Sequence, residues 1–204
     1  MVSDKKNWLY RTIIKRGIDI IASSILLVGL SPIFLIISIW IKLDSKGPVL
    51  FRQQRIGLKN KPFIILKFRS MKENTPDIAT AEFENPECYI TRSGKVLRKT
   101  SLDELPQLIN VFKGEMSFIG PRPLISSEQV VLSLRKKNGA DSVLPGITGL
   151  AQVNGRDEVS PKDKAKLDGK YAQNITFWSD LSICMKTILN ILTHQGIHEG
   201  KQVN

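Results

Sequence analysis

The sequence predicts a mixed α/β fold, mostly helical, in which a re-entrant membrane segment precedes one small cytosolic domain. Residues 20–41 form an uncharged run of twenty-two residues, with Ser31 and Pro32 near its middle. About 150 residues follow, enough for one domain with its own core, and they carry signals for a short β-hairpin and for amphipathic interface helices. We therefore predict a basic N-terminus and anchor over 1–45 and a cytosolic domain over 46–204.

The uncharged run is long enough for one membrane-spanning helix, which needs about 20 apolar residues. Its flanks argue against a span, because residues 1–19 carry a net charge of +3 and residues 42–72 carry +8. Positive flanks stay on the cytoplasmic side, so a span would leave one flank on the wrong side. Pro32 lacks an N–H and breaks or bends a helix. The pattern predicts a helix–break–helix anchor with both ends on the cytoplasmic side.

Two alternatives to this anchor remain open. A signal peptide also has a basic start, but its apolar region is shorter and ends at small residues, whereas this run continues into Trp40 and Lys42. A bent helix that crosses the membrane once is harder to exclude from length and charge. The carbonyls freed at the break need donors, for which the hydroxyls of Ser31 or Ser38, or headgroup-level water, are candidates.

The net charge of +11 lies entirely in residues 1–72, because residues 73–204 hold 16 basic and 16 acidic side chains. A basic collar around an apolar anchor suits the anionic lipids of an inner leaflet. No nucleic-acid partner is expected, because no nucleic-acid-binding module accompanies the charge. Cys88 and Cys184 match no metal or redox spacing, which favours a reduced cytosolic environment.

Residues 48–52 and 63–69 are rich in β-branched and aromatic residues and are separated by turn residues, which predicts a β-hairpin. Lys67 and Arg69 fall on one face of the second strand, because side chains alternate along a strand. Residues 73–90 combine acids and prolines with no basic residue, and they predict a surface loop.

The apolar spacing over 105–112 predicts a helix. A start at Ser101 would pair it with Glu104 in a capping box, but it would place Pro106 where an N–H should already be bonded. A start at Asp103 puts the proline among the free N–H positions, so we prefer it.

A short strand is expected to end at Ile119, and residues 130–134 outline a helix that ends in the basic residues 135–137. Three glycines in 145–156 predict a backbone that approaches a ligand or folds tightly. Residues 177–192 form an unusually apolar amphipathic helix. We favour a core position for it over the membrane interface.

Asp103 and Glu104 are adjacent carboxylates at the predicted helix start, with Arg98 before them and Arg122 after them. Two such carboxylates can hold Mg²⁺ while phosphate oxygens complete its shell, and guanidinium groups grip phosphates. Together they suit transfer of a phosphoryl-linked group. On these residues alone, however, a helix-capping Asp103 and a solvated Glu104 are the favoured interpretation.

The order of the motifs resembles the bacterial sugar transferase family, the monotopic phosphoglycosyl transferases, in their minimal form. The resemblance covers nearly the whole chain in one order. It is carried by KRGIDI (15–20), the Ser31-Pro32 break, GPVLFRQQRIG (47–57), KFRSM (67–71), RKTSLDELPQL (98–108), GPRP (120–123) and PGITGLAQVNGR (145–156).

This resemblance implies covalent catalysis with Mg²⁺ as cofactor. Asp103 would attack the sugar-linked phosphorus of a UDP-sugar and expel UMP, and a polyprenyl phosphate, usually undecaprenyl phosphate, would then take the phosphosugar from the aspartyl intermediate. Glu104 would help Asp103 to hold the metal or would position it. The positions implied for phosphate binding are Lys67, Arg98, Arg122 and Arg156.

The resemblance also implies a monotopic protein of the bacterial inner membrane, with its catalytic domain on the cytoplasmic face, in the first membrane step of glycan assembly. The identity of the UDP-sugar and homo-oligomerisation stay open. A noncatalytic scaffold of a glycan assembly complex at the membrane surface is the alternative function.

Overall fold

The computed structural model describes residues 8–73, 75, 86–155 and 159–193, and it confirms a mixed, mostly helical α/β fold. A π-helical turn, Tyr10–Ile14, leads into the first α-helix. The helices are α2 (Lys15–Gly29), α3 (Ser31–Asp44), α4 (Arg92–Lys99), α5 (Gln107–Lys113), α6 (Gln129–Asn138), α7 (Leu150–Val153), α8 (Pro161–Gln173) and α9 (Phe177–Thr193). The strands are β1 (Leu50–Ile56), β2 (Pro62–Phe68), β3 (Ser117–Ile119) and β4 (Gly146–Thr148).

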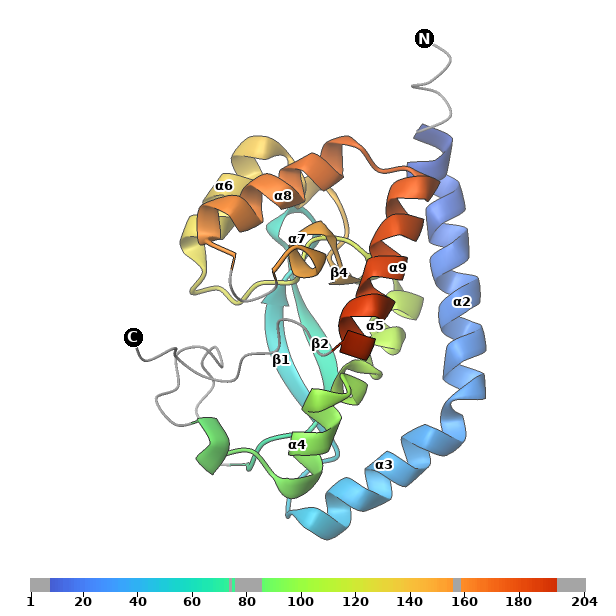
Figure 1. Ribbon diagram of the computed structural model, residues 1–204, viewed down its shortest axis with the longest axis vertical. Helices are drawn as coiled ribbons and strands as arrows, with labels where there is room; N and C mark the ends of the chain where they lie inside the picture. Colours follow the sequence, from blue (N-terminus) through green and yellow to red (C-terminus); the bar gives the residue numbers. More distant parts are fainter. Residues whose placement is uncertain (1–7, 74, 76–85, 156–158, 194–204) are drawn as a thin grey trace.

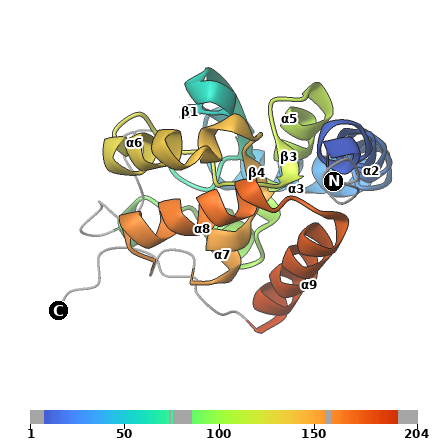
Figure 2. The ribbon, with the colours of Figure 1, turned by 90° about the horizontal axis from the view of Figure 1, so that it is seen from above.

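The long helices α2 and α3 form one side of the molecule, and the hairpin of β1 and β2 lies near its middle (Figure 1). Helices α6 and α8 pack together on the side away from α2, as the view from above also shows (Figure 2). Helix α9 begins near the start of α2 and stands apart from the α6–α8 pair.

Helices α2 and α3 are separated by a sharp bend. Among the described residues no single helix is long and apolar enough to cross a membrane, but Tyr10–Gly29 and Ser31–Asp44 pass that test as a pair bent by 61°. Pro32 cannot donate to the carbonyl of Val28, four residues earlier. The hydroxyl of Ser31 donates to that carbonyl instead, at 2.7 Å. The predicted break is therefore present, and the Ser31 hydroxyl bonds to the carbonyl that the break leaves free.

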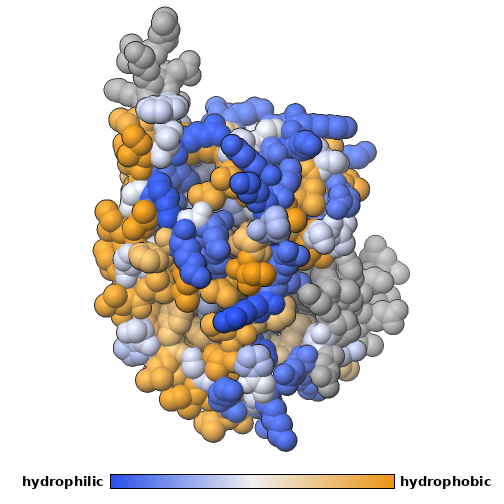
Figure 3. Space-filling model, turned by 180° about the vertical axis from the view of Figure 1, so that it is seen from behind, coloured by the Kyte–Doolittle hydropathy of each residue, from blue (hydrophilic) through white to orange (hydrophobic). Residues whose placement is uncertain are grey.

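Ser38, the other predicted donor, bonds to the carbonyl of Phe34 within its own helix, at 2.6 Å. The outer faces of α2 and α3 expose many large apolar side chains, which form an orange band along that edge of the surface (Figure 3). Large exposed apolar patches are typical of surfaces that bind another protein or a membrane.

The N-terminal half of α2 is fastened to the rest of the protein by two polar side chains. The Arg16 guanidinium donates to the carbonyls of Val111 and Phe112, at 2.7 and 2.9 Å. Those carbonyls lie in the last turn of α5, where cations are favourable. Asp19 is buried and accepts a bond from the backbone N–H of Phe118 at 3.2 Å. These contacts hold the N-terminal half of α2 against α5 and β3.

Helix α3 shares a hydrophobic cluster with the later part of the chain. Ile37 and Ile41 are buried against Phe68 and Leu97, and the rings of Phe34 and Phe68 are 5.3 Å apart. The domain boundary between residues 45 and 46 stays a prediction.

The predicted hairpin is present, with β1 and β2 antiparallel and Leu50 paired with Phe68. Strand β1 extends to Ile56, beyond the predicted end, because its polar half pairs residue by residue with the apolar start of β2. Most of the predicted surface loop 73–90 lies outside the described residues.

The glycines of 145–156 allow two segments of backbone to approach each other closely. Strands β3 and β4 are parallel, and the N–H of Gly120 donates to the Thr148 carbonyl at 2.8 Å. A Cβ at Gly146 or at Gly149 would collide with the backbone of Gly120. The tight fold expected for this segment is therefore confirmed.

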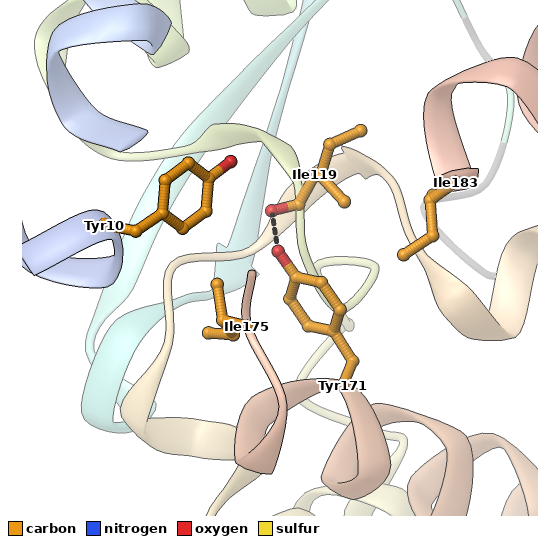
Figure 4. Packing of buried hydrophobic residues seen from close by; sticks show 5 residues of the cluster. All are labelled: Tyr10, Ile119, Tyr171, Ile175 and Ile183. Carbon is orange, nitrogen blue, oxygen red and sulfur yellow. Dashed lines mark hydrogen bonds between the residues drawn. The ribbon is translucent and has the colours of Figure 1, made fainter. Parts of the chain in front are cut away.

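A cluster of buried residues joins the start of the chain to α8 and α9 (Figure 4). The Tyr171 hydroxyl contacts the Ile119 carbonyl at 3.0 Å and the Asp180 carboxylate at 2.8 Å. Asp180 also accepts from the Tyr10 hydroxyl at 2.8 Å and from Lys15 at 2.6 Å. One buried carboxylate thus holds both ends of the described chain together.

The predicted helix start at Asp103 is wrong. A 3₁₀ turn spans Leu102–Glu104, and α5 begins at Gln107, directly after Pro106. Ser101 has a left-handed backbone (φ 57°), and its side chain caps nothing. Pro106 has no N–H to bond backwards, so α-helical bonding starts only after it. Asp103 therefore lies in the turn before the helix and not in its first turn.

The core position favoured for residues 177–192 is also wrong. Only Asp180 and Ile183 of α9 are buried, whereas Trp178 is 73% exposed and Leu192 is 70% exposed. Helix α9 contacts β3, β4 and α7 along one flank. Most side chains on the rest of its surface therefore stay exposed, although many of them are apolar.

Candidate active site

A cavity of about 1540 Å³ contains most of the side chains singled out from the sequence. Lys67 comes from β2, Arg98 from the end of α4, Asp103 and Glu104 from the 3₁₀ turn, and Arg122 from the segment after β3. Arg156 lies outside the described residues. Five of the six predicted catalytic and phosphate-binding residues therefore line one cavity, although they span more than fifty positions of the sequence.

Glu104 contacts the cations of this cavity directly. Its Oε1 lies 2.7 Å from Lys67 Nζ and 4.0 Å from Arg122 Nη1. The side chains of Lys67 and Glu104 are 18% and 22% exposed, which limits the screening of their charges by solvent. Arg122 is more open, at 44%. The pair of Lys67 and Glu104 fixes the 3₁₀ turn against strand β2.

Burial raises the pKa of the Asp103 carboxyl above its ordinary value, to about 6. The positive charge of Lys67 lowers this pKa, the negative charge of Glu104 raises it, and Arg98 and Arg122 lower it. Asp103 is thus a partly desolvated carboxylate among cations. Such a group is a stronger nucleophile than one that is fully solvated.

The backbone of Arg122 is held by Arg135, a residue that the sequence analysis assigned to the basic end of a helix. Arg135 is buried, donates to the Arg122 carbonyl at 2.9 Å, and pairs with the buried Asp168 at 2.6 Å. Its partners lie 13 and 33 positions away, so no local pattern announces them. Arg135 therefore joins the backbone of Arg122 to Asp168 on α8.

Sequence reasoning missed two further features of the cavity. Ser101, whose left-handed backbone turns the chain between α4 and the 3₁₀ turn, lines it. Gln152, on α7, is buried, and its Oε1 has no hydrogen-bond partner among the described residues. The motif at 145–156 was the available signal for Gln152, because it contains this residue.

A divalent cation fits the carboxylates of this cavity. No group of three His, Cys, Asp or Glu side chains within the described ranges is arranged to hold a metal. Mg²⁺, however, is often bound by one or two carboxylates and completes its shell with water and substrate phosphates. Asp103 and Glu104 are such a pair. Burial is the main cause of the raised pKa of Asp103, and a cation between the two carboxylates would relieve the further contribution from the charge of Glu104.

Comparison with known proteins places the chain in a family. The family model described as "Bacterial sugar transferase" matches residues 10–194. This chain belongs to the bacterial sugar transferase family. The match includes the bent helix pair, the hairpin and every described residue of the cavity.

Three relatives illustrate where this sugar transferase stands. The "Uncharacterized sugar transferase EpsL" of Bacillus subtilis is 39% identical over 191 residues, 94% of this chain and 93% of the relative. The "UDP-glucose:undecaprenyl-phosphate glucose-1-phosphate transferase" of Caulobacter vibrioides is 40% identical over 188 residues, covering 88% and 70%. The "Undecaprenyl-phosphate galactose phosphotransferase" of Salmonella typhimurium is 39% identical over 204 residues, covering 91% and 42%.

The geometry gives this sugar transferase a desolvated carboxylate in the cationic part of the cavity, where the charges of Lys67, Arg98 and Arg122 act on it. Three cations arranged around one carboxylate can hold an anionic, phosphate-containing ligand with a phosphorus atom within its reach. Helix α5, to which Arg16 of α2 is bonded, begins three residues after the turn that carries Asp103.

Proposed function

We propose that this protein transfers a sugar phosphate from a UDP-sugar to undecaprenyl phosphate, releasing UMP and forming undecaprenyl-diphosphate sugar. The observation that carries this proposal is the meeting of Asp103 and Glu104 with Lys67, Arg98 and Arg122 in one cavity. The names of the relatives from Caulobacter and Salmonella support the same class of reaction.

The proposed reaction has two displacements at the same phosphorus atom. A carboxylate oxygen of Asp103 forms a bond to the sugar-linked phosphorus, the bond from that phosphorus to the bridging oxygen breaks, and UMP leaves with the bonding electrons. An oxygen of the lipid phosphate then attacks the phosphorus, and the Asp103 carboxylate leaves. Dividing one hard displacement into two easier ones is the advantage of covalent catalysis.

Lys67, Arg98 and Arg122 would bind the phosphates and stabilise the charge that develops during each displacement. Arg156 stays a further candidate. Asp103 and Glu104 would hold Mg²⁺, and Glu104 would in addition orient Asp103. Bound there, Mg²⁺ would neutralise charge on the phosphoryl oxygens.

The acceptor of this reaction is a lipid, so we also propose that the protein lies in the bacterial inner membrane. The bent pair of α2 and α3 would enter the membrane and return, with the catalytic domain on the cytoplasmic face. The 61° bend and the exposed apolar side chains of α2 and α3 support this placement. The basic residues on both flanks would contact anionic headgroups.

The reaction is tested by incubating the detergent-solubilised protein with Mg²⁺, undecaprenyl phosphate and a panel of UDP-sugars. The panel contains UDP-glucose, UDP-galactose and UDP-N-acetylgalactosamine, which the names of relatives suggest, and other UDP-N-acetylhexosamines. We expect release of UMP, but not of UDP, together with a lipid-linked diphosphate sugar. Release of UDP, or no release with any sugar, would contradict the proposal.

A further inference from the structure

The cavity extends from the charged side chains into a region between α2 and α9. Helix α2 and the residue that caps its C-terminus contribute side chains spaced four apart, namely Ile18, Ala22, Leu26 and Leu30. Helix α9 contributes residues spaced three or four apart, namely Phe177, Leu181, Cys184, Ile188 and Ile191. Each spacing defines one face of a helix. Two apolar helix faces therefore border the same space, which we call the α2–α9 groove.

The groove is closed at the end where the two helices begin. Lys15 and Asp180 are 2.6 Å apart, and the rings of Tyr10 and Phe177 meet edge to face with centroids 6.2 Å apart. From this contact α2 and α9 separate along their lengths (Figures 1 and 2). The pinned start and the divergence leave an open space that the side chains of the two helices do not fill.

Three polar side chains of the groove, those of Asp19, Thr148 and Thr187, are already bonded within the protein. Thr148 and Thr187 share a hydrogen bond of 2.7 Å, and Thr187 also donates to the Ile183 carbonyl at 2.8 Å. Asp19 accepts from the N–H of Phe118 at 3.2 Å. These groups have their partners, so the wall suits a hydrocarbon better than a polar ligand.

The whole cavity is larger than one small ligand requires. Ligand pockets are commonly about 300 to 1,000 Å³, and this cavity measures about 1540 Å³. One of its parts is cationic and another is apolar. A ligand that matches both parts carries an anionic head and a long apolar tail.

We propose that the α2–α9 groove binds the first isoprene units of the polyprenyl phosphate acceptor, with the lipid phosphate directed toward Lys67, Arg98 and Arg122. This inference rests on the transferase reaction proposed above and adds the place where the tail of the acceptor is held. The anchor helix α2 then has a second task, since one of its faces forms a wall of the acceptor site.

Neighbouring residues of α9 provide a matched test. Ile188 lines the groove and is 47% exposed, whereas Leu189 does not line the cavity and is 55% exposed. Ile188→Trp should fill part of the groove and raise the KM for undecaprenyl phosphate by about tenfold or more, because tail burial is lost. The KM for the UDP-sugar should stay unchanged, and Leu189→Trp should leave both values near those of the wild type.

A second measurement needs neither turnover nor a folded tryptophan variant. Cys184 is an exposed free thiol in the groove, and Cys88 is the other free cysteine. In Cys88→Ser protein, undecaprenyl phosphate should slow maleimide alkylation of Cys184 severalfold, whereas inorganic phosphate and the UDP-sugar should not. The control carries Cys88→Ser, Cys184→Ser and Met185→Cys, which moves the thiol to an exposed position of α9 that does not line the cavity, and its alkylation should be unaffected by the lipid.

Unchanged alkylation of Cys184 at saturating lipid would overturn the groove as the tail site. An equal rise of the lipid KM in Ile188→Trp and Leu189→Trp would overturn it as well, since it would indicate a general contact of α9 with the micelle. Absence of UMP release from the wild type would instead contradict the transferase reaction, while the alkylation experiment would still report on the groove.

Discussion

Lys67 Nζ lies 2.7 Å from Glu104 Oε1, and this contact joins strand β2 to the 3₁₀ turn that carries Asp103. The two residues are 37 positions apart in the chain. The contact sets the orientation of Glu104 and places a positive charge next to Asp103, whose pKa it lowers. Glu104 is thus both a neighbour of the proposed nucleophile and the partner of a phosphate-binding cation.

We expect Glu104→Gln to shift the Mg²⁺ concentration needed for half-maximal activity upward. The substitution keeps the shape of the side chain but removes one of the two carboxylates proposed to hold the ion. A titration of initial rate against Mg²⁺ measures this shift. The control is Glu115→Gln, which alters a carboxylate that bonds to Asn110 and does not line the cavity. An unchanged Mg²⁺ dependence would remove Glu104 from the metal site.

We expect Asp103→Asn to abolish nearly all turnover while the protein stays folded. The amide keeps the size of the carboxylate but is not a nucleophile. Wild-type protein incubated with its UDP-sugar and Mg²⁺, without lipid, should release about one UMP per active site and gain the mass of a phosphosugar. Intact-mass spectrometry and peptide mapping should locate that mass on Asp103.

Full activity of Asp103→Asn would favour the noncatalytic scaffold. A strict requirement of the lipid for UMP release, with no adduct, would favour direct attack by the lipid phosphate in a ternary complex. An adduct on another residue would keep the two-step reaction but not this nucleophile.

We expect Arg98→Ala and Arg122→Ala each to lower kcat/KM for the UDP-sugar by about ten- to a hundredfold. A charge-assisted phosphate contact contributes about 1.5 to 3 kcal/mol, which corresponds to that range of rates. Lys136→Ala is the control, because this residue is exposed on α6 and does not line the cavity. Equal activity of the three purified variants would show that the phosphates bind elsewhere.

We expect Arg135→Ala to lower the free energy of unfolding by about 3 to 5 kcal/mol, because it leaves the buried Asp168 without its cation. Chemical denaturation measures this loss, and Lys136→Ala serves again as the control. Burial already raises the pKa of Asp168, and Arg135 counteracts that rise.

The loss should also depend on pH. Without Arg135 the folded-state pKa of Asp168 rises further, so the carboxyl favours the folded state only while it is protonated. The loss of stability should therefore be small at acidic pH and grow as the pH rises through the folded-state pKa. A pH-independent loss would mean that packing, and not the charge of Asp168, dominates.

We expect Pro32→Ala to straighten the helix pair and to change its membrane topology. Alanine restores an N–H that can donate to the Val28 carbonyl, which Ser31 occupies in the native protein. Cysteine-accessibility labelling should find both flanks of the native segment on the cytoplasmic side. In Pro32→Ala, part of the protein should expose one flank to the periplasm. Periplasmic labelling of the native protein near residues 1–15 would contradict the re-entrant anchor.

Several features followed from local sequence because their causes are local. The bend follows from the missing N–H of Pro32, the hairpin from two apolar runs around a turn, and the tight crossing of β3 and β4 from glycines without a Cβ. The order of motifs identified the family and named five of the residues that line the cavity. Each motif is itself a short run of neighbouring residues.

Only the tertiary structure decided the features that depend on partners far away in the chain. Ser101 adopts a left-handed backbone and Asp103 lies before α5, although the sequence favoured a helix through Asp103. Arg135 is buried because Asp168 is placed beside it by the packing of α6 on α8. Helix α9 exposes its apolar side chains because it packs along one flank only, and apolar spacing has no information about which faces find a partner.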